Sequence, residues 1–162
     1  MQGTWNTFDR TMMQHCITLA RAAARQGELP FAALVCKDGI IVAEATNRVA
    51  REGDVTRHAE LIAVSDAQRT LKSKRLKGCT LYSVVEPCAM CSFPIRETGI
   101  SRVVFSLRSP VMGGLTRWNV LGDALLAQTM PVFFSPPPWS PVAYWLRTLK
   151  RLGAPGGRYS GA

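Results

Sequence analysis

Arg57-His58-Ala59-Glu60 and Pro87-Cys88-Ala89-Met90-Cys91 are two short stretches, the second beginning 27 residues after Glu60. His58, Cys88 and Cys91 suit a tetrahedral zinc ion and leave its fourth position open. Three protein ligands are typical of a catalytic zinc, whereas a structural zinc is normally closed by four. The two stretches together therefore predict a catalytic zinc centre with the carboxylate of Glu60 beside it.

A second interpretation of these residues is a structural zinc that a fourth protein ligand closes. The candidates for that ligand are Cys16, Cys36, Cys79 and His15. A lone C-x-x-C also occurs in redox motifs and zinc ribbons, so this interpretation stays open. It leaves both Glu60 and the proline before Cys88 without a purpose.

The order H-x-E followed by P-C-x-x-C is the signature of zinc-dependent nucleobase deaminases. On these residues the chain resembles the zinc-dependent cytidine and deoxycytidylate deaminase superfamily, over about Phe8 to Arg108. The resemblance is strongest to its nucleobase (guanine/cytosine-type) and tRNA adenosine deaminase branch. It implies an α/β fold, a three-layer α/β/α sandwich with a mixed five-stranded sheet. It also implies a homodimer whose neighbouring subunits complete the pocket.

The resemblance also implies roles for individual residues. Zinc hydroxide attacks the carbon that bears an exocyclic amine, and Glu60 carries the proton to the ring nitrogen and the leaving ammonia. Asn47 matches by position an asparagine that family members use to hydrogen-bond the base, although an asparagine that ends a strand is also ordinary turn chemistry. Ala59 and Pro87 are expected to shape the pocket, through a backbone N–H and a fixed turn.

Hydrophobic periodicity predicts the elements that carry these motifs. The expected helices cover about 8–26, about 57–71 with Thr56 as N-cap, and a segment that starts at Cys88 and contains Pro94. The expected strands cover 31–36, 40–43, 79–85 and 102–107, with Asp38-Gly39 as the tight turn between the first two. The last two strands flank a helix, which predicts a parallel crossover.

The resemblance fades after residue 108. The glycine-rich stretch 112–118 is interpreted as a hinged lid that brings Trp118 to the substrate. A short helix is expected at 120–128, no regular element at 131–141, and a last helix at about 141–152. The predicted domain organisation is a zinc deaminase domain at 1–130. Residues 131–162 then form a Pro-rich segment, a C-terminal helix and a tail packed on or extending from it.

Composition favours a single cytoplasmic domain with no membrane contact. The chain has 162 residues, 47% of them hydrophobic, which is enough for one buried core. It contains no apolar run of 18 residues, and Met1–Arg10 lacks an apolar signal segment. The five cysteines fit a reducing compartment, with two of them at the metal.

The net charge of +9 leaves the substrate class open, because a basic surplus suits nucleic acid or acidic substrates but is often only a solvated face. The glycine-rich stretch favours a free nucleobase or nucleoside, with a guanine-like purine first. A tRNA adenosine deaminase is the alternative. A non-catalytic zinc-stabilised module that binds nucleic acid is a third hypothesis, which gives Glu60 no role.

Overall fold

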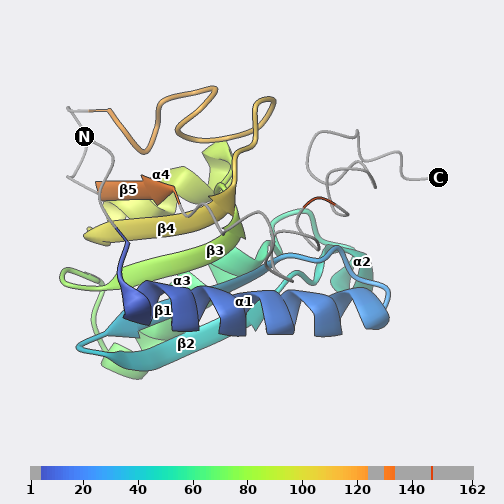
Figure 1. The fold of residues 1–162 in the computed structure, drawn as a ribbon, viewed down its shortest axis with the longest axis horizontal. Helices are drawn as coiled ribbons and strands as arrows, with labels where there is room; N and C mark the ends of the chain where they lie inside the picture. Colours follow the sequence, from blue (N-terminus) through green and yellow to red (C-terminus); the bar gives the residue numbers. More distant parts are fainter. Residues whose placement is uncertain (1–4, 124–129, 134–146, 148–162) are drawn as a thin grey trace.

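The computed structural model describes residues 5–123, 130–133 and 147 (Figure 1). Its helices and strands follow one another as α1 (Thr7–Arg25), β1 (Ala32–Lys37), β2 (Ile40–Thr46), α2 (Val49–Glu52), α3 (Ala59–Leu71), β3 (Thr80–Val85), α4 (Ala89–Glu97), β4 (Arg102–Leu107) and β5 (Met130–Phe133). The predicted elements of the first 107 residues are all present, and β4 has the limits that the sequence predicted.

The strands form one mixed sheet in the order β2-β1-β3-β4-β5. Strand β1 is antiparallel to both β2 and β3, while β3, β4 and β5 run parallel to one another. The β1–β2 turn places Asp38 and Gly39 at φ of 50° and 79°, the left-handed pair that a two-residue hairpin requires. The predicted α/β class, the mixed sheet and the parallel β3–α4–β4 crossover are confirmed.

Helices cover the sheet from both faces (Figure 1). On one face, Met13 and Ile17 of α1 pack against Leu34, Tyr82 and Val104 of the sheet. On the other, residues of α3 and α4 share a buried cluster with sheet residues, among them Ile62, Ala63, Ile95, Val103 and Phe105. Strands buried on both faces need apolar side chains in both directions, which is why β1, β3 and β4 read as continuous hydrophobic runs.

Two predictions about local structure differ from the structure, and a third is confirmed. Helix α3 has His58 as its N-cap, not Thr56, whose hydroxyl donates to Asp54 at 2.7 Å. Residues 131–133 belong to β5, although no regular element was expected there. Pro94 lies inside α4, as predicted, and the helix continues to Glu97.

The predictions for the end of the chain fall mostly outside the described residues. Within the expected helix 120–128, residues 120–123 form a turn and an irregular end, and the remainder is not described. The last helix and the tail also lie outside the described part. Over the residues that are described, no helix has the length and apolar character needed to cross a membrane.

Candidate metal centre and active site

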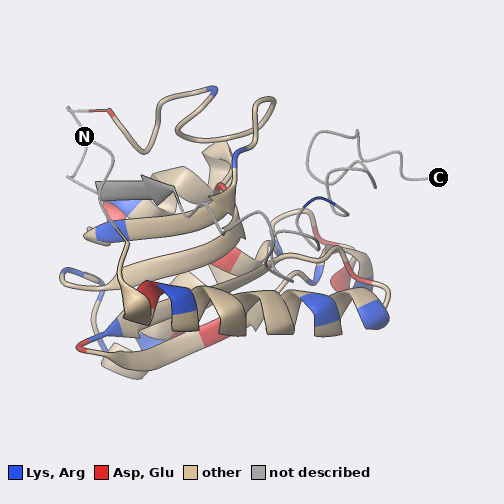
Figure 2. Cartoon of the chain, viewed as in Figure 1, with Lys and Arg blue, Asp and Glu red and all other residues tan. Residues whose placement is uncertain are grey.

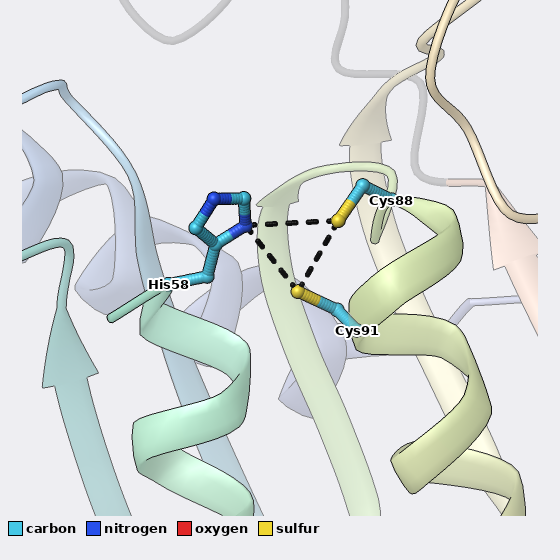
Figure 3. A group of neighbouring side chains, drawn as sticks. All are labelled: His58, Cys88 and Cys91. Carbon is cyan, nitrogen blue, oxygen red and sulfur yellow. Dashed lines mark hydrogen bonds between the residues drawn. The ribbon is translucent and has the colours of Figure 1, made fainter. Parts of the chain in front are cut away.

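Two helices begin at the same place, beside the carboxyl end of β3 (Figure 3). His58 is the N-cap of α3 with extended backbone (φ −69°, ψ 144°), and Cys88 is the N-cap of α4 with similar geometry (φ −68°, ψ 171°). Because a helix N-terminus carries partial positive charge, both positions favour anionic ligands such as thiolates.

His58, Cys88 and Cys91 point toward one another across this gap (Figure 3). The His58 Nδ1 atom lies 3.6 Å from Cys88 Sγ and 3.4 Å from Cys91 Sγ, and the two sulfurs are 3.4 Å apart. A tetrahedral zinc with ordinary Zn–S and Zn–N bonds would separate its ligand atoms by about 3.5–3.8 Å. The three side chains therefore fit a zinc ion almost without movement.

The charges of these side chains suit the same ion. Hydrogen bonding with Cys91 lowers the pKa of Cys88 to about 4, with His58 acting in the same direction against the effect of burial. The bond with Cys88, together with burial, raises the pKa of Cys91, so the pair shares one proton. The Cys88 sulfur also raises the pKa of His58 above its usual value. A divalent cation would take the place of these shared protons.

The four candidates for an additional ligand lie elsewhere. Cys16 and Cys36 are buried on the α1 face of the sheet, where Cys16 contacts the carbonyl of Ala32 at 3.1 Å. His15 bonds Glu44 at 2.8 Å on the surface. Among the described residues, the group of metal-binding side chains consists of His58, Cys88 and Cys91 alone. The three-ligand geometry therefore leaves room for a reactant at the fourth position.

Glu60 lies beside this group but is not part of it. Its carboxylate is buried, with Oε1 accepting from the Ser83 hydroxyl at 3.0 Å and Oε2 3.8 Å from Cys91 Sγ. Burial raises the pKa of Glu60, and the Cys88 sulfur raises it further. Because His58 precedes the helix with extended backbone, His58 and Glu60 reach one site although they are only two residues apart. A raised pKa suits a carboxyl group that accepts and returns a proton.

Three other predicted site residues, Asn47, Ala59 and Pro87, are all buried. Asn47 is buried at the end of β2, and its neighbour Arg48 donates its backbone N–H to the carbonyl of Arg57, next to His58. Ala59 is fully buried in the first turn of α3. Pro87 is buried, and its carbonyl accepts from Gly114 at 2.8 Å. Ala59 and Pro87 thus adjoin metal ligands in the sequence, while Asn47 is connected to the His58 segment through Arg48.

Trp118 lies at the end of the loop that follows β4. The residue is 58% exposed, and the Arg117 guanidinium lies 5.3 Å from the centre of its ring. The N–H groups of Arg117 and Trp118 both bond the carbonyl of Gly113, which pairs with Cys88 in an isolated bridge. Trp118 is therefore on the surface, and its backbone is connected to the metal ligand Cys88 through Gly113.

The loop that follows β4 is anchored by Glu86, and the hinged lid stays a prediction. The buried carboxylate of Glu86 accepts from the N–H groups of Ser109, Leu115 and Thr116 at 2.6–2.9 Å, and from the Thr116 hydroxyl at 2.6 Å. A Cβ atom at Gly113 would collide with this carboxylate. The glycine is therefore needed for this close approach of the backbone to Glu86.

Buried Arg96 holds the far end of the same loop. Its guanidinium donates to the carbonyls of Val120 at 2.9 Å and Leu121 at 2.8 Å, and to that of Asp123. The sequence alone did not predict that Glu86 and Arg96 hold this loop. The available signal for Glu86 was a carboxylate that directly follows a buried strand, where charge needs partners.

Replacing Glu86 with Gln should loosen this loop. The amide would turn N–H groups toward backbone N–H groups, and each buried donor left without an acceptor costs about 1–3 kcal/mol. We expect a lower free energy of unfolding in urea and faster proteolysis within 109–118. The control is Glu97→Gln, at an exposed carboxylate on α4. Equal stability and protection in the two variants would show that Glu86 does not hold the loop.

Comparisons with known proteins agree with this geometry. Residues 6–107 match the family model described as "Cytidine and deoxycytidylate deaminase zinc-binding region". The tRNA-specific adenosine deaminase of Aquifex aeolicus (strain VF5) is 39% identical over 108 residues, which cover 66% of this chain and 72% of the relative. The name of this relative specifies tRNA and not a free base.

Solved structures point to both branches of the resemblance. One, from a study of A-to-I editing by tRNA:A34 deaminases at the wobble position, has a TM-score of 0.70 and 29% identity, covering 78% of this chain and 91% of that chain. The guanine deaminase from Bacillus subtilis has a TM-score of 0.62 and 26% identity, covering 96% and 99%. The recognition made from His58, Glu60, Cys88 and Cys91 is confirmed, and so is zinc as the cofactor. The chain belongs to the cytidine and deoxycytidylate deaminase family of zinc-binding proteins.

Proposed function

We propose that this protein is a zinc-dependent hydrolase that deaminates adenosine in tRNA to inosine and releases ammonia. The observation that carries the hydrolytic reaction is the three-ligand metal group with the buried carboxylate of Glu60 3.8 Å from Cys91. The identity to a tRNA-specific adenosine deaminase supports tRNA as the substrate class. This ordering reverses the one that the glycine-rich loop favoured.

His58, Cys88 and Cys91 hold the metal in the proposed mechanism. Zinc, when bound, supplies the Lewis acidity that makes water nucleophilic near neutral pH. Glu60 takes a proton from the attacking water and delivers it to the ring nitrogen, and then assists departure of the amine as ammonia. Ser83 holds the carboxylate in place through its hydroxyl. The buried position of Glu60 favours this return of the proton, because burial opposes a permanent charge.

The remaining site residues would hold the nucleotide. Asn47 contributes its side-chain amide, Ala59 a backbone N–H, and Pro87 the fixed turn before Cys88. Trp118 is exposed on an anchored loop, which suits stacking of its ring on a base that flanks the reacting nucleotide. Arg117 beside it adds a positive charge for a phosphate.

The charge of the chain is compatible with an RNA partner. The net charge is +9, and Figure 2 shows Lys and Arg positions at both ends of α1 and in several loops, with Asp and Glu positions between them. A spread of this kind favours long-range attraction to phosphates over one defined basic patch. It is consistent with a substrate that touches the protein outside the pocket.

A second candidate function is deamination of free guanine. It is favoured by the similarity to the guanine deaminase from Bacillus subtilis, which extends over almost the whole of both chains. The third hypothesis, a non-catalytic nucleic-acid-binding module, explains the zinc but not a buried carboxylate beside an open metal position. The experiments below separate the three.

The proposal includes the organisation of the whole protein. A zinc deaminase domain at 1–130 would carry the segment 131–162 on it or extending from it. The helices on both faces and the pairing of β5 with β4 support a three-layer sandwich with five strands. A homodimer in the cytoplasm is the arrangement that the family resemblance favours.

Affinity for tRNA should be high at low salt and fall by about tenfold or more between 50 and 200 mM salt, because several phosphate contacts release counterions. Filter binding or fluorescence anisotropy measures it, while nucleoside analysis of the bound tRNA measures inosine. Trp118→Ala should weaken binding by about 1–3 kcal/mol if the ring stacks on a base.

The same protein is also incubated with free guanine, adenine, cytosine and their nucleosides, with ammonia release as the readout. Turnover of guanine without inosine in tRNA would replace our proposal by the second candidate. Salt-dependent tRNA binding without turnover of any substrate would favour the binding module.

A further inference from the structure

The side chain of Asn47 is held in one orientation. It is 1% exposed, and its Nδ2 donates to the Glu28 Oε2 atom at 3.2 Å. Its Oδ1 atom has no hydrogen-bond partner among the described residues. A buried acceptor without a partner is costly, so its presence points to a ligand that supplies a donor.

An ionised carboxylate has no proton to donate, so Glu28 in that form accepts hydrogen bonds and donates none. Its carboxylate is 7% exposed and also takes the backbone N–H groups of Arg51 at 2.7 Å and Ala50 at 3.3 Å. Every group around the carboxylate in these contacts is therefore a donor. Asn47 must turn its NH₂ toward Glu28, which leaves its oxygen facing the other way.

Asn47 is next to a residue that is hydrogen-bonded to the segment before the first metal ligand. Asn47 follows β2 directly, and its own N–H bonds the carbonyl of Phe31 at 2.9 Å. The next residue, Arg48, bonds the carbonyl of Arg57 at 3.0 Å, and Arg57 precedes the metal ligand His58. The backbone of Asn47 is thus connected to the first metal-binding segment.

We propose that Glu28 is a positioning residue that locks the amide of Asn47, so that the site presents a hydrogen-bond acceptor to an N–H or O–H group of the substrate. The proposal deepens the proposed function and rests on it for the presence of a substrate. Glu28 itself does not touch the reacting atoms. Its effect passes through the orientation of one amide.

One substitution at Glu28 should reverse the orientation of the Asn47 side-chain amide. In Glu28→Gln, the side-chain oxygen is expected to keep the shorter bond from Arg51, which places the new NH₂ toward Asn47. Asn47 must then turn its oxygen toward Gln, and the site presents a donor where the wild type presents an acceptor. We expect kcat/KM to fall by about 5- to 30-fold with zinc content close to wild type, while the Ala50 N–H, which then faces the new NH₂, lowers the melting temperature modestly.

Exchanging the two functional groups should restore activity. In the double variant Glu28→Gln with Asn47→Asp, the carboxylate at 47 accepts from the amide at 28 and still offers a second oxygen to the substrate. Asn47→Asp alone puts two carboxylates together and should also lower kcat/KM. The double variant should exceed both single variants severalfold, which a role of Glu28 in stability alone does not predict.

The matched control is Glu44→Gln, an exposed carboxylate on the strand that precedes Asn47. It should keep wild-type kcat/KM. The proposal is overturned if Glu28→Gln stays within twofold of wild type, or if the double variant is no better than the single variants. The kinetics use whichever substrate the wild type converts. A failure of the tRNA assignment therefore remains distinct from a failure of the claim that Glu28 orients the Asn47 amide.

A second readout needs no turnover. In the ¹H–¹⁵N spectrum of the zinc-loaded protein, the side-chain NH₂ of Asn47, assigned by its loss in Asn47→Asp, should be protected from exchange. Glu28→Gln should remove this protection. An unprotected NH₂ in the wild type would overturn the proposal even if no substrate is converted.

Discussion

Glu60→Gln should lower kcat on the order of 10²–10⁴-fold, while the protein keeps its zinc and its fold. The substitution keeps the size of a side chain that is buried between Ser83 and Cys91. It removes the ability to accept a proton from water and return it. Steady-state rates of inosine formation and metal analysis of the same sample measure the two quantities together.

The control for Glu60 is Glu52→Gln, at an exposed carboxylate on α2 that pairs with Arg57. It should leave kcat near the wild-type value, although it removes a charge close to the segment that carries His58. Undiminished turnover in Glu60→Gln would refute the assigned role. Loss of zinc in that variant would instead make Glu60 part of the metal site.

Cys88→Ala should lose most of the bound zinc and the activity with it. Cys88 approaches both other ligands, at 3.6 and 3.4 Å, so its removal leaves two ligands for a metal that normally takes three or four. Because metal binding is coupled to folding, the variant should also unfold at lower temperature. Removal of zinc from the wild type with a chelator should lower the melting temperature in the same direction.

Cys79→Ala provides the comparison for Cys88→Ala. Cys79 is a fully buried cysteine that lies outside the metal group, so its variant should keep one zinc per chain. Zinc loss in Cys79→Ala would revive the structural site with a fourth protein ligand. A full equivalent of zinc in Cys88→Ala would move the site elsewhere.

Local patterns predicted the elements that carry the site because each is set by residues close in sequence. Side chains of strand β4 pack against both helix layers, so four of its six residues, Val103, Val104, Phe105 and Leu107, are apolar. The spacing of Cys88 and Cys91 fits one helical turn, and α4 begins there. The metal group followed from these two facts and from His58, which directly precedes α3.

The contacts that position the site were not predictable in this way. Glu28 meets Asn47 from 19 residues away, and Glu86 meets Thr116 from 30. Only the fold brings these partners together. Thr56 was predicted as the N-cap of α3, but its hydroxyl and backbone N–H both donate to the Asp54 carboxylate instead. Strand β5 was missed because it contains Pro131, which a strand tolerates only at its start, at a sheet edge or at a bulge.

The glycine-rich loop was the reason for placing a free base ahead of tRNA as the expected substrate. Glycine permits a hinge, but it also permits close approach of the backbone to a buried side chain. Gly113 has the second purpose, because the Glu86 carboxylate occupies the space of its missing Cβ. Without the position of Glu86, the two meanings of glycine cannot be distinguished.

The origin of the oxygen atom in the product tests the central claim most directly. The zinc-loaded protein is incubated with tRNA in ¹⁸O-labelled water, and the nucleosides are analysed by mass spectrometry. A hydrolytic deaminase predicts inosine that carries one solvent oxygen for each ammonia released, and almost none with Glu60→Gln. Inosine without the label, or labelled inosine formed equally fast by Glu60→Gln, would contradict the account.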